Sequence, residues 1–110
     1  MILASDIELI VIEWLDKRKI EYSFQSSIGG GFYELGGSVV DFLLNDLGLA
    51  WRVQGDYWHR GVVPEGRDLI QREMLEGEGW TVIDLWGEDI LDPTRLEQAM
   101  RLALQGQEML

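Results

Sequence analysis

The chain has 110 residues and carries 20 Asp and Glu against 9 Lys and Arg, which gives a formal net charge of −11 at pH 7. Its length allows one domain, residues 1–110, and its 46% apolar content argues against disorder. The absence of cysteine excludes disulfides and thiolate metal sites. No apolar run reaches the roughly 18 residues of a membrane span and no signal peptide is visible, so we expect a cytoplasmic protein without membrane contact.

The first half of the chain predicts one helix followed by three strands. Residues 5–18 combine a capping residue with apolar residues at helical spacing, which predicts an amphipathic helix. Residues 21–28 and 37–44 are predicted strands separated by a glycine-rich turn, and the second is apolar except for Asp41. After a short turn, residues 49–54 predict a third strand.

The second half predicts a helix, a strand and a final helix. Residues 66–77 are expected to be helical and residues 80–86 to form a strand rich in β-forming residues. Asp92 followed by Pro93 is a strong helix start, and the apolar face of that helix contains Leu96, Ala99, Met100 and Ala103. A β-α-β unit places its two strands in parallel, so the order α-β-β-β-α-β-α predicts an α/β fold with a mixed sheet flanked by helices.

Asp41 is the first candidate functional residue because it interrupts an apolar strand. Burying a carboxylate costs several kcal/mol unless a cation or hydrogen-bond donors compensate it. Two interpretations stay open from the spacing alone: a buried carboxylate with a partner, or an aspartate that faces solvent at the end of a strand.

The only histidine, His59, follows the end of the predicted strand 49–54 after Gly55. A single histidine is most often a surface or core residue, but strand ends are also where sites are commonly built. Asp68, at the start of the next helix, allows two interpretations as well. It can pair with Arg72 at i,i+4, or it can accept a hydrogen bond from His59 and fix the tautomer of the imidazole.

A series of short motifs follows Asp41 at characteristic spacings. Twelve residues later comes a Val-x-Gly-x-aromatic-Trp-His element, then an Arg-Asp pair and a Leu-x-x-x-Gly-Trp-x-Val-x-x-x-Trp stretch. The residues are Val53, Gly55, Tyr57, Trp58, His59, Arg67, Asp68, Leu75, Gly79, Trp80, Val82 and Trp86. This combination resembles the very-short-patch-repair endonuclease branch of the PD-(D/E)xK restriction-endonuclease-like superfamily. The resemblance implies a restriction-endonuclease-like fold with an α-β-β-β-α-β core, to which the last helix is added.

The resemblance also implies a metal site. Asp41 would bind Mg²⁺, or Mn²⁺ in its place, through its side chain, and Val53 would bind it through the backbone carbonyl. Gln54 could add a neutral oxygen. Glu8 matches the family's helix glutamate and is therefore a candidate catalytic residue, although it could equally be a first-turn residue favoured by the helix dipole. Glu13 lies off the apolar stripe of the helix and is the poorer candidate.

The catalytic base follows from the same resemblance, whereas the DNA contacts are predicted from the distribution of charge along the chain. His59 would activate the attacking water and Asp68 would orient His59. Arg52, Arg60 and Arg67 are expected to contact DNA, because residues 52–72 hold four arginines against three acidic residues while the rest of the chain is strongly acidic. Elsewhere the charge repels nucleic acid, so binding would need a homodimer or a larger assembly to add contacts.

The sequence departs from the family in two respects. The acidic-x-Lys motif is replaced by Arg52-Val53-Gln54, and the zinc site of the mismatch-repair members is missing because the chain has no cysteine. We therefore expect no zinc and no T:G mismatch recognition.

Two functions follow from these observations. The first is a small Mg²⁺-dependent DNA endonuclease, or the nuclease module of a larger assembly, in a prokaryotic or phage setting. The alternative is a catalytically inactive nuclease-fold module that binds proteins or mimics DNA with its acidic surface.

Overall fold

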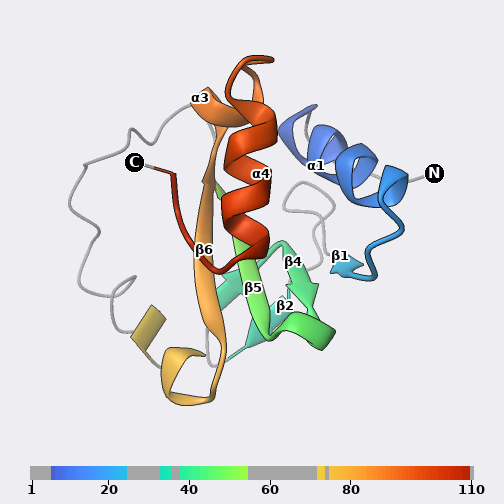
Figure 1. Cartoon of the computed structure of the whole chain (residues 1–110). Helices are drawn as coiled ribbons and strands as arrows, with labels where there is room; N and C mark the ends of the chain where they lie inside the picture. The colour runs from blue at the N-terminus through green and yellow to red at the C-terminus, as the bar shows by residue number, and fades with distance from the viewer. Residues whose placement is uncertain (1–5, 25–32, 36–37, 55–71, 74, 110) are drawn as a thin grey trace.

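The computed structural model describes residues 6–24, 33–35, 38–54, 72–73 and 75–109. Its elements are, in chain order, α1 (Asp6–Lys17), β1 (Ser23–Phe24), β2 (Tyr33–Leu35), β3 (Ser38–Val40), β4 (Phe42–Leu44), a 3₁₀ turn (Asn45–Leu47), β5 (Leu49–Gln54), β6 (Thr81–Trp86), α3 (Gly87–Ile90) and α4 (Leu96–Leu104). Residues 72–73 and 75–77 are also helical. Figure 1 shows these elements along the chain.

A mixed four-stranded sheet forms the centre of the fold, with the strand order β1-β4-β5-β6. The β1–β4 and β4–β5 pairs are antiparallel, whereas β5 and β6 are parallel over their full lengths. Strands β2 and β3 pair with each other in a separate antiparallel ladder. The predicted mixed sheet flanked by helices is therefore confirmed, and so is the parallel pair on either side of residues 72–77.

Alternation along the strands gives the sheet two different faces. Leu49, Trp51 and Val53 of β5 contribute to a large core with α1, α3 and α4. Ala50 points the other way, into a smaller cluster with Leu75 and Val82. Helices thus cover both faces, as Figure 1 shows for α1 and α4 on one of them.

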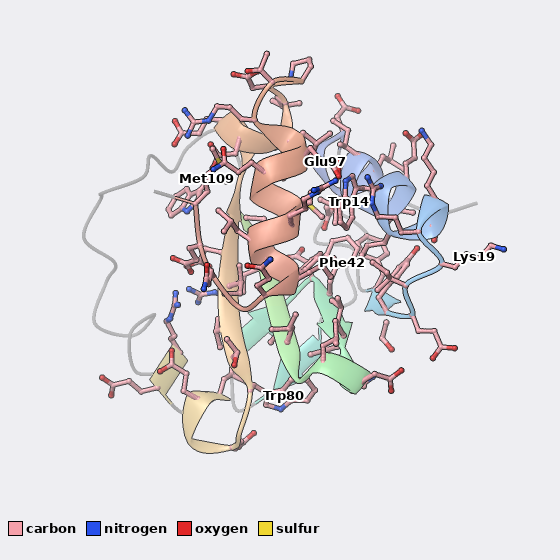
Figure 2. All side chains as sticks on the ribbon, in the orientation of Figure 1. Trp14, Lys19, Phe42, Trp80, Glu97 and Met109 are labelled. Atoms are coloured by element: carbon pink, nitrogen blue, oxygen red, sulfur yellow. The ribbon has the colours of Figure 1, made fainter. Side chains whose placement is uncertain are left out.

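The first and last long helices are joined by polar contacts as well as by the core. The indole Nε1 of Trp14 donates to Glu97 at 3.0 Å, and both carboxylate oxygens of Glu97 bind Arg18, at 2.8 and 2.9 Å. The Arg18 guanidinium also lies 3.8 Å from the centre of the Trp14 ring. Figure 2 shows Trp14 and Glu97 between the two helices. This contact links α1 to α4 at the surface.

The predicted strand 37–44 is wrong as a single element. The chain bends at Asp41, so that β3 joins β2 while β4 joins the main sheet. The backbone N–H of Asp41 still donates to the Trp51 carbonyl at 3.1 Å, but its side chain accepts the backbone N–H of Val53 at 2.8 Å. A carboxylate that accepts a hydrogen bond from a backbone N–H competes with the regular hydrogen bonds between strands. This competition accounts for the break between β3 and β4.

Other boundaries differ less. The predicted helix 5–18 and strands 49–54 and 80–86 are confirmed to within one residue at each end. Of the predicted strand 21–28, Ser23–Phe24 is a strand and the residues from 25 onward lie outside the described part of the chain. The same holds for residues 66–71 of the predicted helix 66–77.

The final helix begins later than Asp92-Pro93 predicts. Asp92 Oδ1 accepts the backbone N–H and the hydroxyl of Thr94, at 2.9 and 2.7 Å, and forms a turn that leads into α4 at Leu96. The predicted apolar face is confirmed, with Ala99, Met100 and Ala103 buried. The short helix α3 was not predicted, since its four residues are too few for a periodic signal. None of the helices among the described residues is long and apolar enough to cross a membrane.

Candidate active site

Two predicted site residues from distant parts of the sequence meet inside the protein. Glu8 lies in the early turns of α1 and is completely buried, and Asp41 at the break between β3 and β4 is only 5% exposed. Their side chains are hydrogen-bonded to each other. Of the two interpretations of Asp41, the structure therefore supports the buried carboxylate with a partner. Glu13, on the same helix, is exposed.

The environment of Asp41 changes its protonation. Burial, together with the hydrogen bond and the charge of Glu8, raises the pKa of Asp41 from 3.8 to about 8. The Val53 amide and the charge of Arg52 act in the opposite direction but do not cancel this effect. At neutral pH and without a cation, the Glu8–Asp41 pair therefore keeps a proton. That proton is what a hydrogen bond between two carboxyl groups requires.

Val53, which was predicted as a metal ligand together with Asp41, lies against the same pair. Its N–H donates to Asp41 Oδ2 at 2.8 Å. In a β-strand the N–H and C=O of one residue point to the same side, so the Val53 carbonyl is directed toward the side of Asp41 as well. The two carboxyl groups and the backbone of Val53 thus lie close together.

These oxygen donors fit a hard divalent cation. Mg²⁺ is usually held by one or two carboxylates and keeps several of its waters, which is the donor set that Glu8, Asp41 and Val53 provide. Within the described residues, no three His, Cys, Asp or Glu side chains are arranged so that they could hold a metal ion together. These oxygen donors are ones that Mg²⁺ and Mn²⁺ accept.

The prediction that Arg52 contacts DNA does not agree with its position. Arg52 is 5% exposed, and its guanidinium binds Asp84 through two hydrogen bonds, from Nε to Oδ1 at 2.8 Å and from Nη2 to Oδ2 at 3.0 Å. A guanidinium that is buried and held by a fork-like pair is not available to a phosphate group. Side chains alternate between the two faces of the sheet along β5, so Arg52 lies on the same face as Ala50 and points into the protein interior.

The remaining predicted site residues are not placed. His59, Arg60, Arg67 and Asp68 lie outside the described residues, and so does the side chain of Gln54. Their predicted roles as base, orienting group, DNA contacts and additional metal ligand therefore stay predictions.

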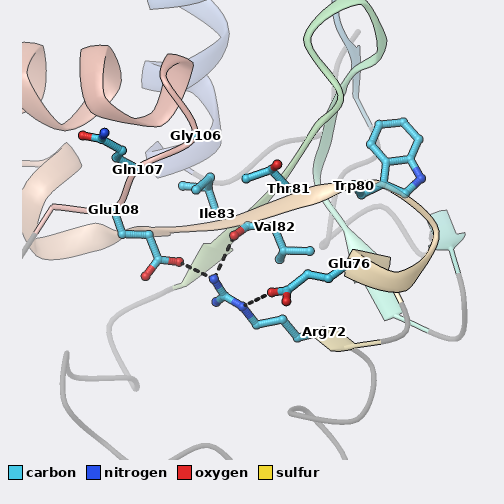
Figure 3. Close-up of a pocket in the computed structure, with 9 residues that line it drawn as sticks. All are labelled: Arg72, Glu76, Trp80, Thr81, Val82, Ile83, Gly106, Gln107 and Glu108. Carbon is cyan, nitrogen blue, oxygen red and sulfur yellow. Dashed lines mark hydrogen bonds and ion pairs between the residues drawn. The ribbon is translucent and has the colours of Figure 1, made fainter.

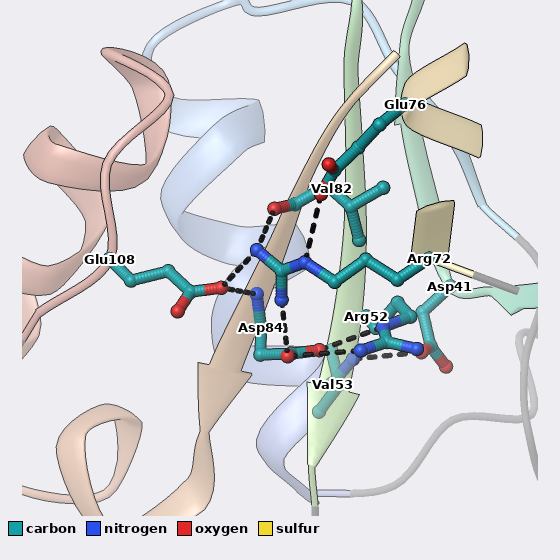
Figure 4. Close-up of polar contacts among 8 residues, drawn as sticks. All are labelled: Asp41, Arg52, Val53, Arg72, Glu76, Val82, Asp84 and Glu108. Atoms are coloured by element: carbon teal, nitrogen blue, oxygen red, sulfur yellow. Dashed lines mark hydrogen bonds and ion pairs between the residues drawn. The ribbon is translucent and has the colours of Figure 1, made fainter. Parts of the chain in front are cut away.

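A network of charged side chains adjoins the site and was not predicted. Asp84 accepts hydrogen bonds from Arg52 and, at 3.0 Å, from Arg72 Nη1. Arg72 also binds Glu108 at 3.1 Å, and Glu108 accepts the backbone N–H of Asp84 at 3.0 Å. Figure 4 shows the chain of alternating charges that results. Arg52 and Asp84 each interrupt an apolar strand, which is the signal that could have identified them as a pair, whereas the sequence gives no signal for Glu108.

A shallow pocket of about 630 Å³ is lined in part by Arg72 and Glu108 of this network. It is bounded by Arg72 and Glu76, by the start of β6 and by residues 106–108 of the C-terminal segment (Figure 3). Glu8 and Asp41 are not among the residues that line it. The pocket and the carboxyl pair are therefore separate features.

Comparisons with known proteins support the fold. No protein-family model matches the chain, and a search of curated proteins finds no match. Among solved structures, the chain resembles the homing endonuclease I-Bth0305I catalytic domain with a TM-score of 0.61 and 23% sequence identity. The match covers 89% of this chain and 92% of that domain. The chain therefore has the α/β, restriction-endonuclease-like fold predicted from its motifs. The match does not distinguish the very-short-patch-repair branch within that fold.

Proposed function

We propose that the chain is the catalytic domain of a divalent-metal-dependent DNA endonuclease, acting alone or as the nuclease module of a larger assembly. The observation that carries this proposal is the buried pair of Glu8 and Asp41 beside the Val53 backbone, within a restriction-endonuclease-like fold. The solved domain of similar fold is named as a homing endonuclease, which favours the same class of activity.

The cost of the carboxyl pair argues for a role beyond stability. Two adjacent acidic side chains in a protein interior are destabilising, because each loses its hydration and each disfavours ionisation of the other. Glu8 is nevertheless completely buried on the face of α1 that otherwise holds apolar residues. An apolar side chain at this position would stabilise the core more effectively. A bound divalent cation would offset the cost of ionising both groups.

In this proposal Glu8, Asp41 and the Val53 carbonyl hold Mg²⁺, or Mn²⁺ in its place, and Gln54 can add a side-chain oxygen. A cation bound there would neutralise charge on the scissile phosphate and lower the pKa of a bound water. The protein's own contribution is to keep three oxygen donors oriented: α1 supplies Glu8, the break before β4 supplies Asp41, and the Val53 amide holds one oxygen of Asp41 in place.

His59 is the proposed base, because its imidazole can take a proton from water near neutral pH. Asp68 would accept a hydrogen bond from the other ring nitrogen and stabilise the imidazolium. Arg60 and Arg67 would contact the DNA backbone. These four roles rest on the motifs in the sequence, which also favour the very-short-patch-repair-like branch over other branches of this fold.

Two observations favour the alternative, a nuclease-fold module that does not cut. The net charge of −11 disfavours contact with DNA, and the position expected to carry the acidic-x-Lys motif holds Arg52, whose side chain is bound to Asp84. An inactive module of this kind would bind basic partners instead of DNA.

A plasmid-nicking assay separates the two functions. The assay compares the wild-type protein in Mg²⁺, in Mn²⁺ and in EDTA with Asp41→Asn, Glu8→Gln and His59→Ala. Two matched variants serve as controls: Glu13→Gln, an exposed glutamate on the same helix, and Asp46→Asn, an exposed aspartate five residues after Asp41. We expect metal-dependent nicking that the three site variants lose and the two controls keep. No nicking by the wild type with either metal would support the inactive module.

A further inference from the structure

A buried ion pair lies directly beside the proposed site. The side chains of Arg52 and Asp84 are 6% and 11% exposed, and they face each other across the parallel β5–β6 pair in matching register. Two residues earlier on the same face, the corresponding positions are Ala50 and Val82, both buried and apolar. Apolar side chains can therefore fill such a buried position between β5 and β6, and the fold does not require a charged pair there. An apolar pair would fill the same space, and replacing a buried ion pair by apolar residues is often neutral or stabilising.

Arg52 also lies close to Asp41. The β4–β5 register aligns Phe42 with Trp51, the Asp41 N–H donates to the Trp51 carbonyl, and the Asp41 side chain accepts the Val53 N–H, so Asp41 lies beside residues 51–53 of β5. In Figure 4 the Arg52 guanidinium lies between the carboxylates of Asp84 and Asp41. Its charge acts on Asp41 from this position. The next residue, Val53, donates its N–H to the same carboxylate.

The outer part of the network limits the movement of Arg52. Asp84 is bound on its other side by Arg72, which is in turn bound by Glu76 at 3.0 Å and by Glu108 at 3.1 Å. Arg72 also donates to the Val82 carbonyl at 2.9 Å. The C-terminal segment, through Glu108, thus helps to hold the carboxylate that fixes Arg52.

We propose that Arg52 is a positioning residue for Asp41 and that Asp84, held by Arg72 and Glu108, fixes the guanidinium in place. This inference rests on the proposed function, because Asp41 is the residue being positioned for metal binding. Arg52 touches neither substrate nor metal and acts through Asp41. In this role Arg52 keeps one Asp41 oxygen hydrogen-bonded to the Val53 N–H. It thereby maintains the orientation of the Asp41 carboxylate when the cation binds.

The test replaces the ion pair with an apolar pair in the double variant Arg52→Met/Asp84→Leu, which leaves the net charge unchanged. The control is Glu13→Gln/Lys17→Gln, a charge-neutral change at two exposed positions of α1. The measurements are the melting temperature, Mn²⁺ affinity by calorimetry, kcat and KM for nicking, and the ¹⁵N–¹H resonance of Val53.

We expect the double variant to fold with a melting temperature close to that of the wild type, but to bind Mn²⁺ about 10–100-fold more weakly and to lose a similar factor in kcat with little change in KM for DNA. In the single variant Asp84→Asn, which leaves the residue next to Val53 unchanged, the Val53 resonance should shift. Unchanged Mn²⁺ affinity and an unchanged Val53 resonance would overturn the proposal and leave the pair with a structural role only.

Two further outcomes are separable. If the double variant does not fold, Asp84→Asn, which keeps the shape of the side chain, decides the question, and unchanged Mn²⁺ affinity in that variant overturns the proposal. If the wild-type protein does not nick DNA, the proposed function fails. Mn²⁺ affinity and the Val53 resonance then still show whether Arg52 positions Asp41.

Discussion

The carboxyl groups of Glu8 and Asp41 are hydrogen-bonded to each other in the protein interior, one from a helix and the other from the break between two strands. This relationship links the fold to the proposed chemistry. Packing α1 against the sheet is what brings Glu8 to Asp41, and the pair holds a proton that a divalent cation would have to displace.

The first prediction concerns stability as a function of pH in the absence of divalent cations. The folded pKa of Asp41, about 8, lies above its ordinary value of 3.8, so between these values the folded protein keeps a proton that the unfolded chain has released. The contribution of Asp41 to the free energy of unfolding is therefore fully present below about pH 4 and is lost as the pH rises toward 8. Urea denaturation at several pH values in EDTA measures this slope. Asp41→Asn should flatten it, and an equally steep slope in that variant would contradict the assignment.

The second prediction concerns the effect of metal on stability. Mg²⁺ or Mn²⁺ should raise the melting temperature of the wild type, because a ligand that binds only the folded state stabilises it. The increase should be larger at pH 8 than at pH 6, since protons compete with the cation for Asp41. Thermal melts of Asp41→Asn and Asp46→Asn check this. The metal should have no effect on the first and its full effect on the second, and equal increases in both variants would place the cation elsewhere.

The sequence predicted the framework better than the details of the site. Periodicity and capping located α1, β5 and β6, since each of these elements has a regular apolar pattern and a clear end. The bend at Asp41 could not be predicted, because it depends on the Val53 N–H, which only the folded sheet brings to that side chain. The same reason accounts for Arg52: its basic side chain suggested a DNA contact, but strand alternation and Asp84 turn it inward.

The third prediction concerns the DNA-binding face. Arg60→Glu and Arg67→Glu should each weaken DNA binding in a gel-shift titration by several-fold at low salt, because removal of one phosphate contact reduces the electrostatic contribution to affinity. Arg101→Glu, on the exposed side of α4, is the control and should have a small effect. Equal losses for all three substitutions would mean that binding responds to net charge alone and that residues 60–67 do not form the face.

The fourth prediction separates stability from activity at a position remote from the carboxyl pair. Gly48 ends the 3₁₀ turn with a φ of 67°, a conformation in which an L-residue is strained. Gly48→Ala should lower the free energy of unfolding by about 1–2 kcal/mol, as measured by urea denaturation, while nicking at a temperature well below the melting point stays unchanged. A loss of nicking in this folded variant would show that the turn before β5 also shapes the site.

The most direct measurement is a crystal structure of the protein grown with Mn²⁺, with the ion located by its anomalous scattering. We predict one ion bound by carboxylate oxygens of Glu8 and Asp41 and by the Val53 carbonyl, at the distances of about 2.0–2.2 Å typical of small divalent cations. An ion bound at another place, or a Glu8–Asp41 hydrogen bond that persists at saturating Mn²⁺, would contradict the assignment of this pair as a metal site.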